Sequence, residues 1–286
     1  MLPTFFIIGA PKCGTTSVAR WLSQHPDVLF ADIKEPHFFN TDMNNRQITS
    51  LSEYERLFDK RNGTERVVGE ASTWYLYSQT AVTNIEKTVI DPLYIVLLRN
   101  PITMVQSLYS HNVLHCHEDA SSFEEAWLLQ ETRARGRQIP ARCKEPSFLQ
   151  YGCACSLGSQ LERLVETVPK QRVHCIVLDD LIHNPKSEYI RTLSFLGLKY
   201  DGRDEFMAYN RRRIARSMTI QKILLSVYRT KKALGIRRQW GLLKWNEREV
   251  PAAMRNVSSA PEWLAEYFDD EIRHVSRILG RNVWTC

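Results

Sequence analysis

The amino-acid sequence predicts an α/β fold, in which a central, mainly parallel sheet of about five strands carries helices on both faces. Two observations predict it. Five short apolar runs are typical of buried strands, and segments with the periodicity of amphipathic helices lie between them. Strands that alternate with helices along a chain pair in parallel, and the connecting helices then cover the sheet.

Each predicted element follows from its local pattern. The apolar runs that predict strands cover residues 5–8, 28–30, 66–68, 94–98 and 173–178. Helical periodicity predicts helices over residues 17–25, 51–59, 79–90, 103–111, 122–134, 158–168, 185–196, 218–232 and 261–279. No linker rich in Gly, Ser or Pro divides the chain, so we expect one domain over residues 1–286, in which residues 220–286 form a helical addition.

Membrane-spanning and secretory segments are not expected. The best apolar stretch covers residues 93–98, whereas a transmembrane helix needs about 20 apolar residues. The first residues lack the basic start of a signal peptide, and the apolar run that follows them stops at Gly9. We therefore expect a cytoplasmic protein without a membrane partner.

The net charge of +6 is concentrated in the last third of the chain. Residues 1–200 contain 21 Lys and Arg against 22 Asp and Glu, whereas residues 201–286 contain 17 against 10. A basic segment favours an anionic partner. A solvated helix face is the other interpretation, and a protein that binds nucleic acid through this segment without catalysis is a third.

A loop with the sequence GAPKCG at residues 9–14 joins the first strand to the first helix and predicts an anion site. Backbone N–H groups and the helix N-terminus present positive potential to an oxyanion, and Lys12 adds a full charge. Gly9 and Gly14 let the backbone turn and approach the anion closely. In nucleotide triphosphatases Lys follows the last Gly directly, whereas Lys12 precedes Gly14, so Mg²⁺ ligation is not implied. The alternative is a plain strand–turn–helix connection.

Residues 34–39, Lys-Glu-Pro-His-Phe-Phe, place a base, an acid and an imidazole beside two aromatic side chains. A carboxylate near a Lys and an apolar wall suits a general base, because desolvation raises its pKa while the cation opposes that rise. Glu35 is therefore a candidate base. The alternative is a surface loop with a local ion pair.

Arg99 directly follows the apolar run at 94–98, and Ser107 comes later, on the predicted helix. An Arg at the carboxyl end of a parallel strand points into the usual ligand crevice. Its guanidinium fork suits a phosphate, and the Ser107 hydroxyl can add a further hydrogen bond. The alternative is an ion pair that caps the helix.

Together these segments resemble the sulfotransferases that use 3′-phosphoadenylyl sulfate (PAPS), in particular the bacterial and heparan-type carbohydrate enzymes. Residues 11–17 are similar to their 5′-phosphosulfate loop, and residues 34–39 to their Lys-Glu-x-His-Phe-Phe motif. Arg99 and Ser107 match their 3′-phosphate motif, and Arg216 is the best match to an Arg-Ser pair of bacterial members. The matches span about residues 4–220.

The resemblance implies a role for each matching residue. Glu35 is implied as the base that takes the acceptor proton, with Lys12, Lys34 and His37 as further catalytic residues. The implied PAPS-binding residues are Lys12, Cys13, Gly14, Thr15, Thr16, Ser17, Arg99, Ser107 and Arg216. No metal is implied, because Lys and backbone donors supply the positive charge.

The chain also departs from the family pattern. Asn40 stands where several heparan-type members have Asp, which puts a second carboxylate at the site in doubt. Residues 69–76 look like the family segment that borders the acceptor cleft, but Ala71 replaces a Lys that is frequent in heparan-type enzymes. This replacement argues against a polysulfated acceptor. Trp74 and Tyr75 either wall the acceptor site or belong to the core.

The resemblance implies transfer of the sulfuryl group from PAPS to a hydroxyl or amine of a small molecule, natural product or sugar, with adenosine 3′,5′-bisphosphate (PAP) as product. One alternative is a P-loop kinase that uses ATP and Mg²⁺, against which the position of Lys12 argues. The other is the nucleic-acid binder, which leaves residues 34–39 without a purpose. We expect a small-molecule or carbohydrate acceptor and no nucleic-acid partner. The sequence predicts neither the individual acceptor nor the oligomeric state.

Overall fold

The computed structural model describes residues 1–60, 63–209, 213–233, 245–249 and 261–284. The chain forms two compact units. The first consists of residues 1–104, 156–209 and 265–286, and the second of residues 105–155 and 210–264. The expectation of one domain over residues 1–286 stays a prediction.

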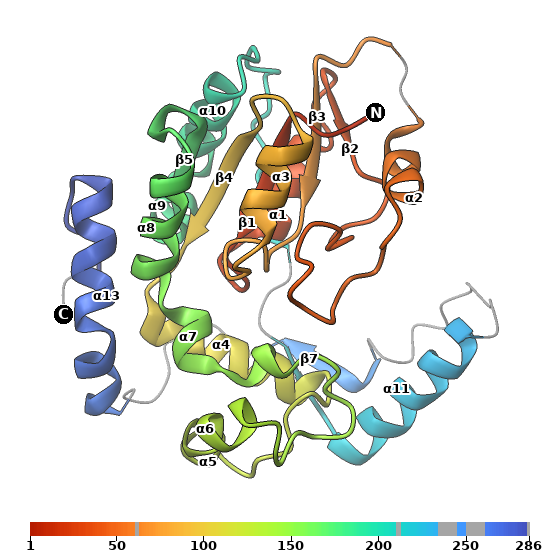
Figure 1. Ribbon diagram of the computed structural model, residues 1–286, viewed down its shortest axis with the longest axis vertical. Coiled ribbons are helices and arrows are strands. Elements are labelled where there is room, and N and C mark those ends of the chain that lie inside the picture. Colours follow the sequence, from red (N-terminus) through yellow and green to blue (C-terminus); the bar gives the residue numbers. More distant parts are fainter. Residues whose placement is uncertain (61–62, 210–212, 234–244, 250–260, 285–286) are drawn as a thin grey trace. The chain divides into compact units, whose positions relative to one another are not determined.

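A five-stranded parallel sheet forms the centre of the first unit (Figure 1). Its strands are β1 (Phe5–Gly9), β2 (Val28–Phe30), β3 (Val67–Ala71), β4 (Leu93–Leu98) and β5 (Val173–Val177). They follow the order β2-β3-β1-β4-β5, and each neighbouring pair is parallel. The α/β class and the parallel sheet that the sequence predicts are confirmed.

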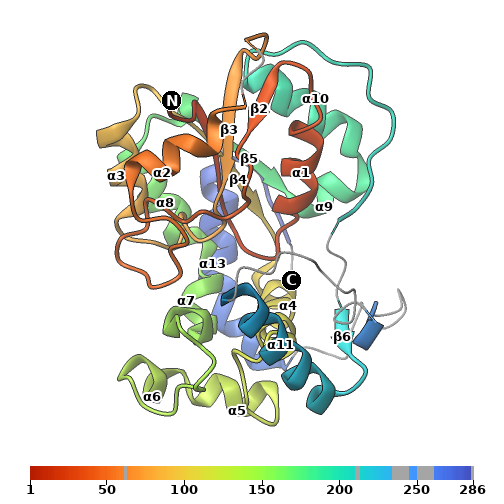
Figure 2. The same ribbon diagram turned by 90° about the vertical axis from the view of Figure 1, so that its right-hand side faces the viewer.

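Helices cover both faces of this sheet. Helices α1 (Thr15–Leu22), α9 (Leu178–His183) and α10 (Pro185–Phe195) lie on one face, and α3 (Ala81–Thr88) and α8 (Leu157–Thr167) lie on the other (Figure 2). On the outer side of α8, the Ser159 N–H donates a hydrogen bond to Glu271 Oε2 of α13 (Glu262–Leu279) at 2.9 Å. Shorter helices of this unit are α2 (Leu51–Glu55), η1 (Arg56–Phe58) and η3 (Lys170–Arg172).

The covered sheet explains why its strands are apolar throughout. Every residue from 5 to 8 in β1 and from 94 to 98 in β4 is fully buried. A strand that is buried on both faces has no solvent side, so its residues do not alternate between apolar and polar. Burying each large apolar side chain stabilises the fold by about 1.5–3 kcal/mol. The edge strand β2 is less buried than these central strands.

The second unit is mainly helical. Its elements are α4 (Pro101–Leu114, which begins in the first unit), α5 (Phe123–Leu128), α6 (Gln130–Ala134), η2 (Pro146–Leu149), α7 (Tyr151–Cys155), β6 (Arg213–Ala215), α11 (Met218–Ala233) and β7 (Glu247–Glu249). A buried ion pair lies inside it. Arg133 donates through Nη1 and Nη2 to the two Glu118 carboxylate oxygens at 2.7 and 2.6 Å, and Tyr151 Oη donates to the same carboxylate at 2.7 Å.

The structure differs from the sequence prediction in short elements. Strand β3 continues to Ala71 instead of ending at residue 68, and β5 ends at Val177 because Leu178 begins α9. The two-stranded antiparallel sheet of β6 and β7, whose strands lie on either side of α11 in the sequence, was not predicted. Each of its strands has three residues, and Arg213 pairs with Glu247 at 3.3 Å, so no apolar run marks it in the sequence.

Candidate active site

The carboxyl ends of β1 and β4 lie side by side where the connections of the sheet diverge. The chain leaves β1 towards β2 on one side of the sheet and leaves β4 towards β5 on the other. Ligands of open α/β sheets bind at such a point. Arg99, directly after β4, donates from Nη1 to the backbone oxygen of Lys12 at 3.0 Å, which joins it to the loop that follows β1.

Two positions of the loop that follows β1 require glycine. Gly14 has a φ of 92°, which L-amino acids with side chains rarely adopt. A Cβ atom at Gly9 would lie 2.9 Å from Cβ of Leu76, so only glycine allows this close approach. Because Gly14 is also the N-cap of α1, no side chain caps the helix. The backbone N–H groups at such an N-terminus attract an anion.

Both polar and apolar side chains surround the N-terminus of α1. Thr15 and Ser17 are 5% and 6% exposed, and Ser17 Oγ accepts a hydrogen bond from the Tyr209 N–H at 3.0 Å. Cys13 is fully buried, with its Sγ 3.7 Å from Met104 Sδ. Burial raises the pKa of the Cys13 thiol to about 12, so the side chain stays neutral and belongs to the core.

Lys12 carries an unusually labile charge. Burial and the neighbouring Arg99 guanidinium lower the pKa of its ammonium to about 8, although the Glu35 carboxylate acts in the opposite direction. These interactions place Lys12 in the combined electrostatic field of Arg99 and Glu35. The structure thus brings together three of the residues that the sequence singles out.

The segment at residues 34–39 is held in an uncommon backbone conformation. Glu35 and His37 have φ values of 62° and 52°. The Glu35 N–H donates to the Ala71 oxygen at 2.9 Å, and the His37 N–H donates to Ser72 Oγ at 3.0 Å. Ala71 and Ser72 stand at the end of β3, so the sheet itself fixes this segment.

The Glu35 carboxylate lies within a set of polar side chains. It forms an ion pair with Lys34 Nζ, His37 Nε2 lies 3.7 Å from its Oε2, and Thr73 Oγ1 donates to its Oε1 at 3.3 Å. Burial alone would raise its pKa, but the His37 ring and the Lys34 charge outweigh burial and lower the pKa below the usual range. Glu35 is therefore ionised at neutral pH, and about a third of its side chain is exposed.

A second carboxyl group lies beneath this segment. Glu70 is fully buried, its Oε2 accepts a hydrogen bond from Tyr54 Oη at 2.9 Å, and burial raises its pKa to about 7. Asn40, which replaces the Asp of several family members, donates from Nδ2 to Asn45 Oδ1 at 2.7 Å. Neither residue adds an exposed carboxylate beside Glu35.

The aromatic residues after β3 belong to the core. Trp74 is 6% exposed and Tyr75 is fully buried, with its Oη accepting a hydrogen bond from the Phe39 N–H at 3.2 Å. The core interpretation of this pair is therefore correct. Sequence reasoning gave no role to Ser72 and Thr73, which contact His37 and Glu35. Their only signal was their place in the family-like segment at 69–76.

Ser107 and Arg216 belong to the second unit, and their pairing with Arg99 and the loop stays a prediction. Ser107 lies on α4 and is 7% exposed. The Arg216 N–H donates to the Asn246 oxygen at 2.7 Å, beside the two-stranded sheet of β6 and β7. Residues 211 and 212, which carry other arginines of this stretch, lie outside the described residues.

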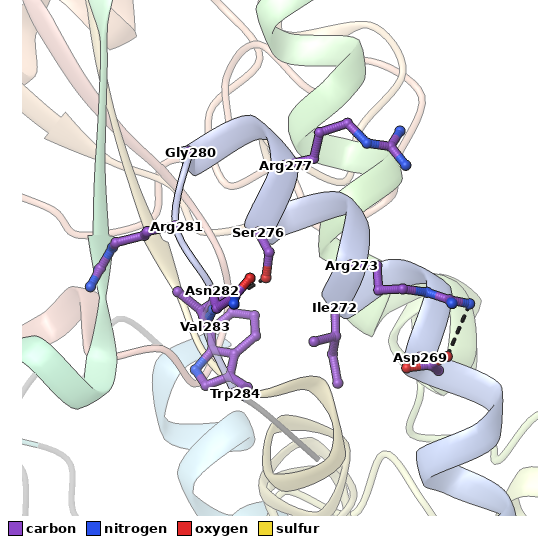
Figure 3. A pocket seen from close by; sticks show the side chains of 10 residues that line it. All are labelled: Asp269, Ile272, Arg273, Ser276, Arg277, Gly280, Arg281, Asn282, Val283 and Trp284. Atoms are coloured by element: carbon purple, nitrogen blue, oxygen red, sulfur yellow. Dashed lines mark hydrogen bonds and ion pairs between the residues drawn. The ribbon is translucent and has the colours of Figure 1, made fainter.

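A pocket of about 700 Å³ lies elsewhere in the first unit (Figure 3). It is lined by the end of α13 and the residues after it: Asp269, Ile272, Arg273, Ser276, Arg277, Gly280, Arg281, Asn282, Val283 and Trp284. Arg281 forms an ion pair with Asp180, and Trp284 Nε1 donates to Asp179 Oδ2 at 2.8 Å. None of the candidate site residues lines this pocket.

The described residues contain neither a metal cluster nor a membrane-spanning helix. Within those ranges, no group of three or more His, Cys, Asp or Glu side chains is placed to hold a metal ion. Over the same part of the chain, no helix has the length and apolar character required to cross a membrane.

Comparison with solved structures gives matches over nearly the whole chain. A sulfotransferase from Alicyclobacillus acidocaldarius is 25% identical, with a TM-score of 0.72, over 99% of this chain and 98% of the other. Mouse sulfotransferase SULT7A1 complexed with PAP is 12% identical, with a TM-score of 0.52, over 97% of this chain and 87% of the other. The latter likeness shows the shared fold.

Comparison with curated proteins and family models gives the same family. Heparan sulfate glucosamine 3-O-sulfotransferase 3B1 of Mus musculus is 28% identical over 209 residues, which are 73% of this chain and 50% of that protein. The chain spans half or less of the length of the first curated relatives that it matches. The family model described as "Sulfotransferase domain" matches residues 2–239, and the chain therefore belongs to the sulfotransferase family.

Proposed function

We propose that this chain transfers the sulfuryl group of PAPS to a hydroxyl or amine of an acceptor and releases PAP. The observation that carries the proposal is the junction at the ends of β1 and β4. There Arg99 binds the Lys12 backbone, and the Lys12 ammonium interacts with both Arg99 and Glu35. The cations suit an anionic sulfuryl donor, and the ionised carboxylate beside them suits the role of proton acceptor.

The loop fits the phosphosulfate part of the donor. The α1 N-terminus has no capping side chain and no acidic residue in its first turn, so nothing in that turn opposes a bound anion. We assign the 5′ side of the donor to Lys12, the backbone of residues 12–16, and the hydroxyls of Thr15, Thr16 and Ser17. Ser17 Oγ already accepts one hydrogen bond, and its proton is available for an anion.

We assign the 3′-phosphate of the donor to Arg99, with Ser107 and Arg216 as further contacts from the second unit. A guanidinium presents two parallel N–H donors to a phosphate. Arg99 also holds the loop through its hydrogen bond to Lys12, so the same residue joins the two phosphate sites. The 3′-phosphate would then select PAPS over adenylyl nucleotides without this group.

Glu35 acts as the general base in this proposal. As the acceptor oxygen or nitrogen bonds to sulfur, its proton becomes strongly acidic, so a carboxylate with a low pKa is basic enough to take it. The proton moves to Glu35, the new bond to sulfur forms, and the bond between sulfur and the 5′-phosphate oxygen breaks. Lys34 and His37 orient the carboxylate through the contacts described above.

Lys12 and the loop amides stabilise the leaving group. PAPS supplies the sulfuryl group and leaves as PAP, which gains negative charge on the 5′-phosphate. Preorganised donors at the place where charge develops are the largest contribution to catalysis in many enzymes. Because Lys12, Arg99 and the helix N-terminus provide positive charge, we propose that the reaction needs no metal ion.

The acceptor is proposed as a small molecule, natural product or sugar. One feature supports an acceptor without many sulfate groups: Ala71 stands where heparan-type enzymes often have a Lys. The cytoplasmic location and the absence of a nucleic-acid partner stay predictions from the sequence.

Turnover with PAPS tests this function. The purified chain would be incubated with PAPS and a panel of alcohols, amines and sugars, and mass spectrometry would follow both PAP and the acceptors. We expect PAP to form in step with a mass gain of one SO₃ group on an acceptor. PAP formation at the same slow rate with and without every acceptor, and no acceptor gaining mass, would contradict the proposal.

A further inference from the structure

Helix α11 (Met218–Ala233) carries an apolar stripe on its exposed side. Ile220, Ile223 and Val227 are 37%, 58% and 42% exposed. Positions i, i+3 and i+7 lie along one face of an α-helix, so the three side chains form a continuous stripe. The neighbouring Tyr228 is also 42% exposed. A soluble helix usually buries such a face.

The opposite side of α11 anchors the helix to the second unit. Gln221 and Leu225 are 1% and 8% exposed. Gln221 Nε2 donates to the Leu114 oxygen of α4 at 3.2 Å, and Arg142 donates from Nη1 to the Lys222 oxygen at 3.0 Å. The helix therefore already has its packing partners, and the apolar stripe is a second face that these contacts leave exposed.

The charge of α11 indicates what covers this stripe. The helix contains four basic residues, Lys222, Arg229, Lys231 and Lys232, and no Asp or Glu. An amphipathic helix with cations and a narrow apolar face lies in the headgroup region of a bilayer, with its apolar side chains at the acyl boundary. Anionic lipids add electrostatic attraction for each Lys or Arg near the surface.

We propose that α11 binds the chain peripherally to an anionic lipid surface. A nucleic acid or an acidic polysaccharide would satisfy the cations but would leave the apolar stripe in water. A second copy of the chain would bury the stripe but would bring two helices of the same charge together. An anionic membrane matches both the apolar stripe and the positive charge of the helix. The expectation of no membrane partner rested on spanning and secretory segments, and this proposal concerns peripheral binding.

Vesicle co-sedimentation of the full chain tests the proposal. The vesicles would contain either phosphatidylcholine alone or phosphatidylcholine with phosphatidylglycerol, at low and high sodium chloride. We expect binding to the anionic vesicles only, and weaker binding at high salt. Ile223→Asp should reduce the bound fraction at least about tenfold, because a charge replaces an apolar side chain that enters the bilayer.

Ile90→Asp is the matched control, because Ile90 is 92% exposed and lies just beyond α3 in the first unit. It should bind vesicles like the unchanged chain. PAP titration of each variant reports the nucleotide site separately, so failure of this proposal and failure of the proposed function are distinguishable. Equal binding by Ile223→Asp, or equal binding to neutral vesicles, would overturn the proposal.

Two further outcomes would also overturn it. If the unchanged chain ignores vesicles and Ile223→Asp dissociates a dimer in size-exclusion chromatography with light scattering, the stripe is an interface between copies. If the chain ignores vesicles and Ile223→Asp lowers the melting temperature, the stripe is covered by the chain itself.

Discussion

His37 Nε2 lies 3.7 Å from Glu35 Oε2, and both residues have a positive φ. A non-glycine residue in this region costs of order 1–3 kcal/mol, and such residues cluster at functional sites. Here the hydrogen bonds to Ala71 and Ser72 at the end of β3 hold them in place. In the proposed function, this strained backbone conformation directs the Glu35 carboxylate towards the acceptor.

Replacing Glu35 with Gln should stop transfer and spare donor binding. General-base catalysis contributes roughly 10²–10⁴-fold to rate, so we expect kcat to fall by about that factor. Calorimetry with PAP should give an unchanged Kd. Glu53→Gln, at an exposed position on α2, is the control and should keep full activity. Normal turnover of Glu35→Gln would disprove the assignment of the base.

The charge of Lys12 should make kcat/KM for PAPS depend on pH. Its pKa of about 8 means that it loses its charge as the pH rises through that value. We therefore expect kcat/KM for PAPS to fall above about pH 8. Lys12→Arg should shift this fall to higher pH, since an Arg stays protonated. Lys12→Ala should lower kcat by roughly 10²–10³-fold. An identical alkaline limb in Lys12→Arg would show that another group is responsible.

Arg99 should discriminate between nucleotides. If it binds the 3′-phosphate, Arg99→Ala should weaken PAP binding much more than binding of adenosine 5′-phosphate, which lacks that group. Isothermal titration calorimetry with both ligands measures the difference. Arg20→Ala is a suitable control, because Arg20 is exposed near the other end of α1. Equal weakening of both nucleotides would remove the 3′-phosphate assignment.

Glu70 should make the stability of the fold depend on pH. Burial raises its pKa from 4.5 to about 7, so the folded state holds this proton more tightly than the unfolded state. The stability that this proton contributes is complete below about pH 4.5 and is lost as the pH rises towards about 7. Melting temperatures of the unchanged chain should therefore fall relative to those of Glu70→Gln across this interval. A difference between the two melting temperatures that stays constant with pH would contradict the raised pKa of Glu70.

The ion pair between Glu118 and Arg133 should be essential to the second unit. Both side chains are fully buried, and breaking such a pair leaves an uncompensated charge. We expect Glu118→Ala to cost about 3–5 kcal/mol in urea unfolding. Glu131→Ala removes an exposed i, i+4 pair with Arg135 and should cost little. Similar losses in the two variants would mean that the buried pair contributes no more than a surface pair.

The strands and helices could be predicted closely where a continuous run of residues carries the pattern. The runs at 5–8 and 94–98 are apolar because both faces of the sheet are covered, so each run marks a central strand directly. The pairing of β6 with β7 could not be found in this way. The strands pair through charged residues such as Arg213 and Glu247, which are far apart in the sequence.

The sequence predicts candidate residues for the site but not the electrostatics around them. Sequence reasoning identified Glu35 with its neighbours Lys34 and His37, and it left the balance between burial and charge at Glu35 open. Burial raises the pKa of Glu35, and the contacts with His37 and Lys34 outweigh burial and lower it. Thr73, just after the end of β3, also donates a hydrogen bond to Glu35. A contact between residues 35 and 73 has no local signal in the sequence. Trp74 and Tyr75 were ambiguous for the same reason, since burial is a property of the folded chain.

Calorimetric titration of the purified chain with PAP, compared with ATP and Mg²⁺, tests the central claim most directly. We expect a clear isotherm with PAP in the absence of metal, because the loop after β1 and the Arg99 side chain bind its two phosphates. We expect no comparable heat with ATP and Mg²⁺. A clear isotherm with ATP and Mg²⁺ and none with PAP would contradict the assignment of a PAPS site.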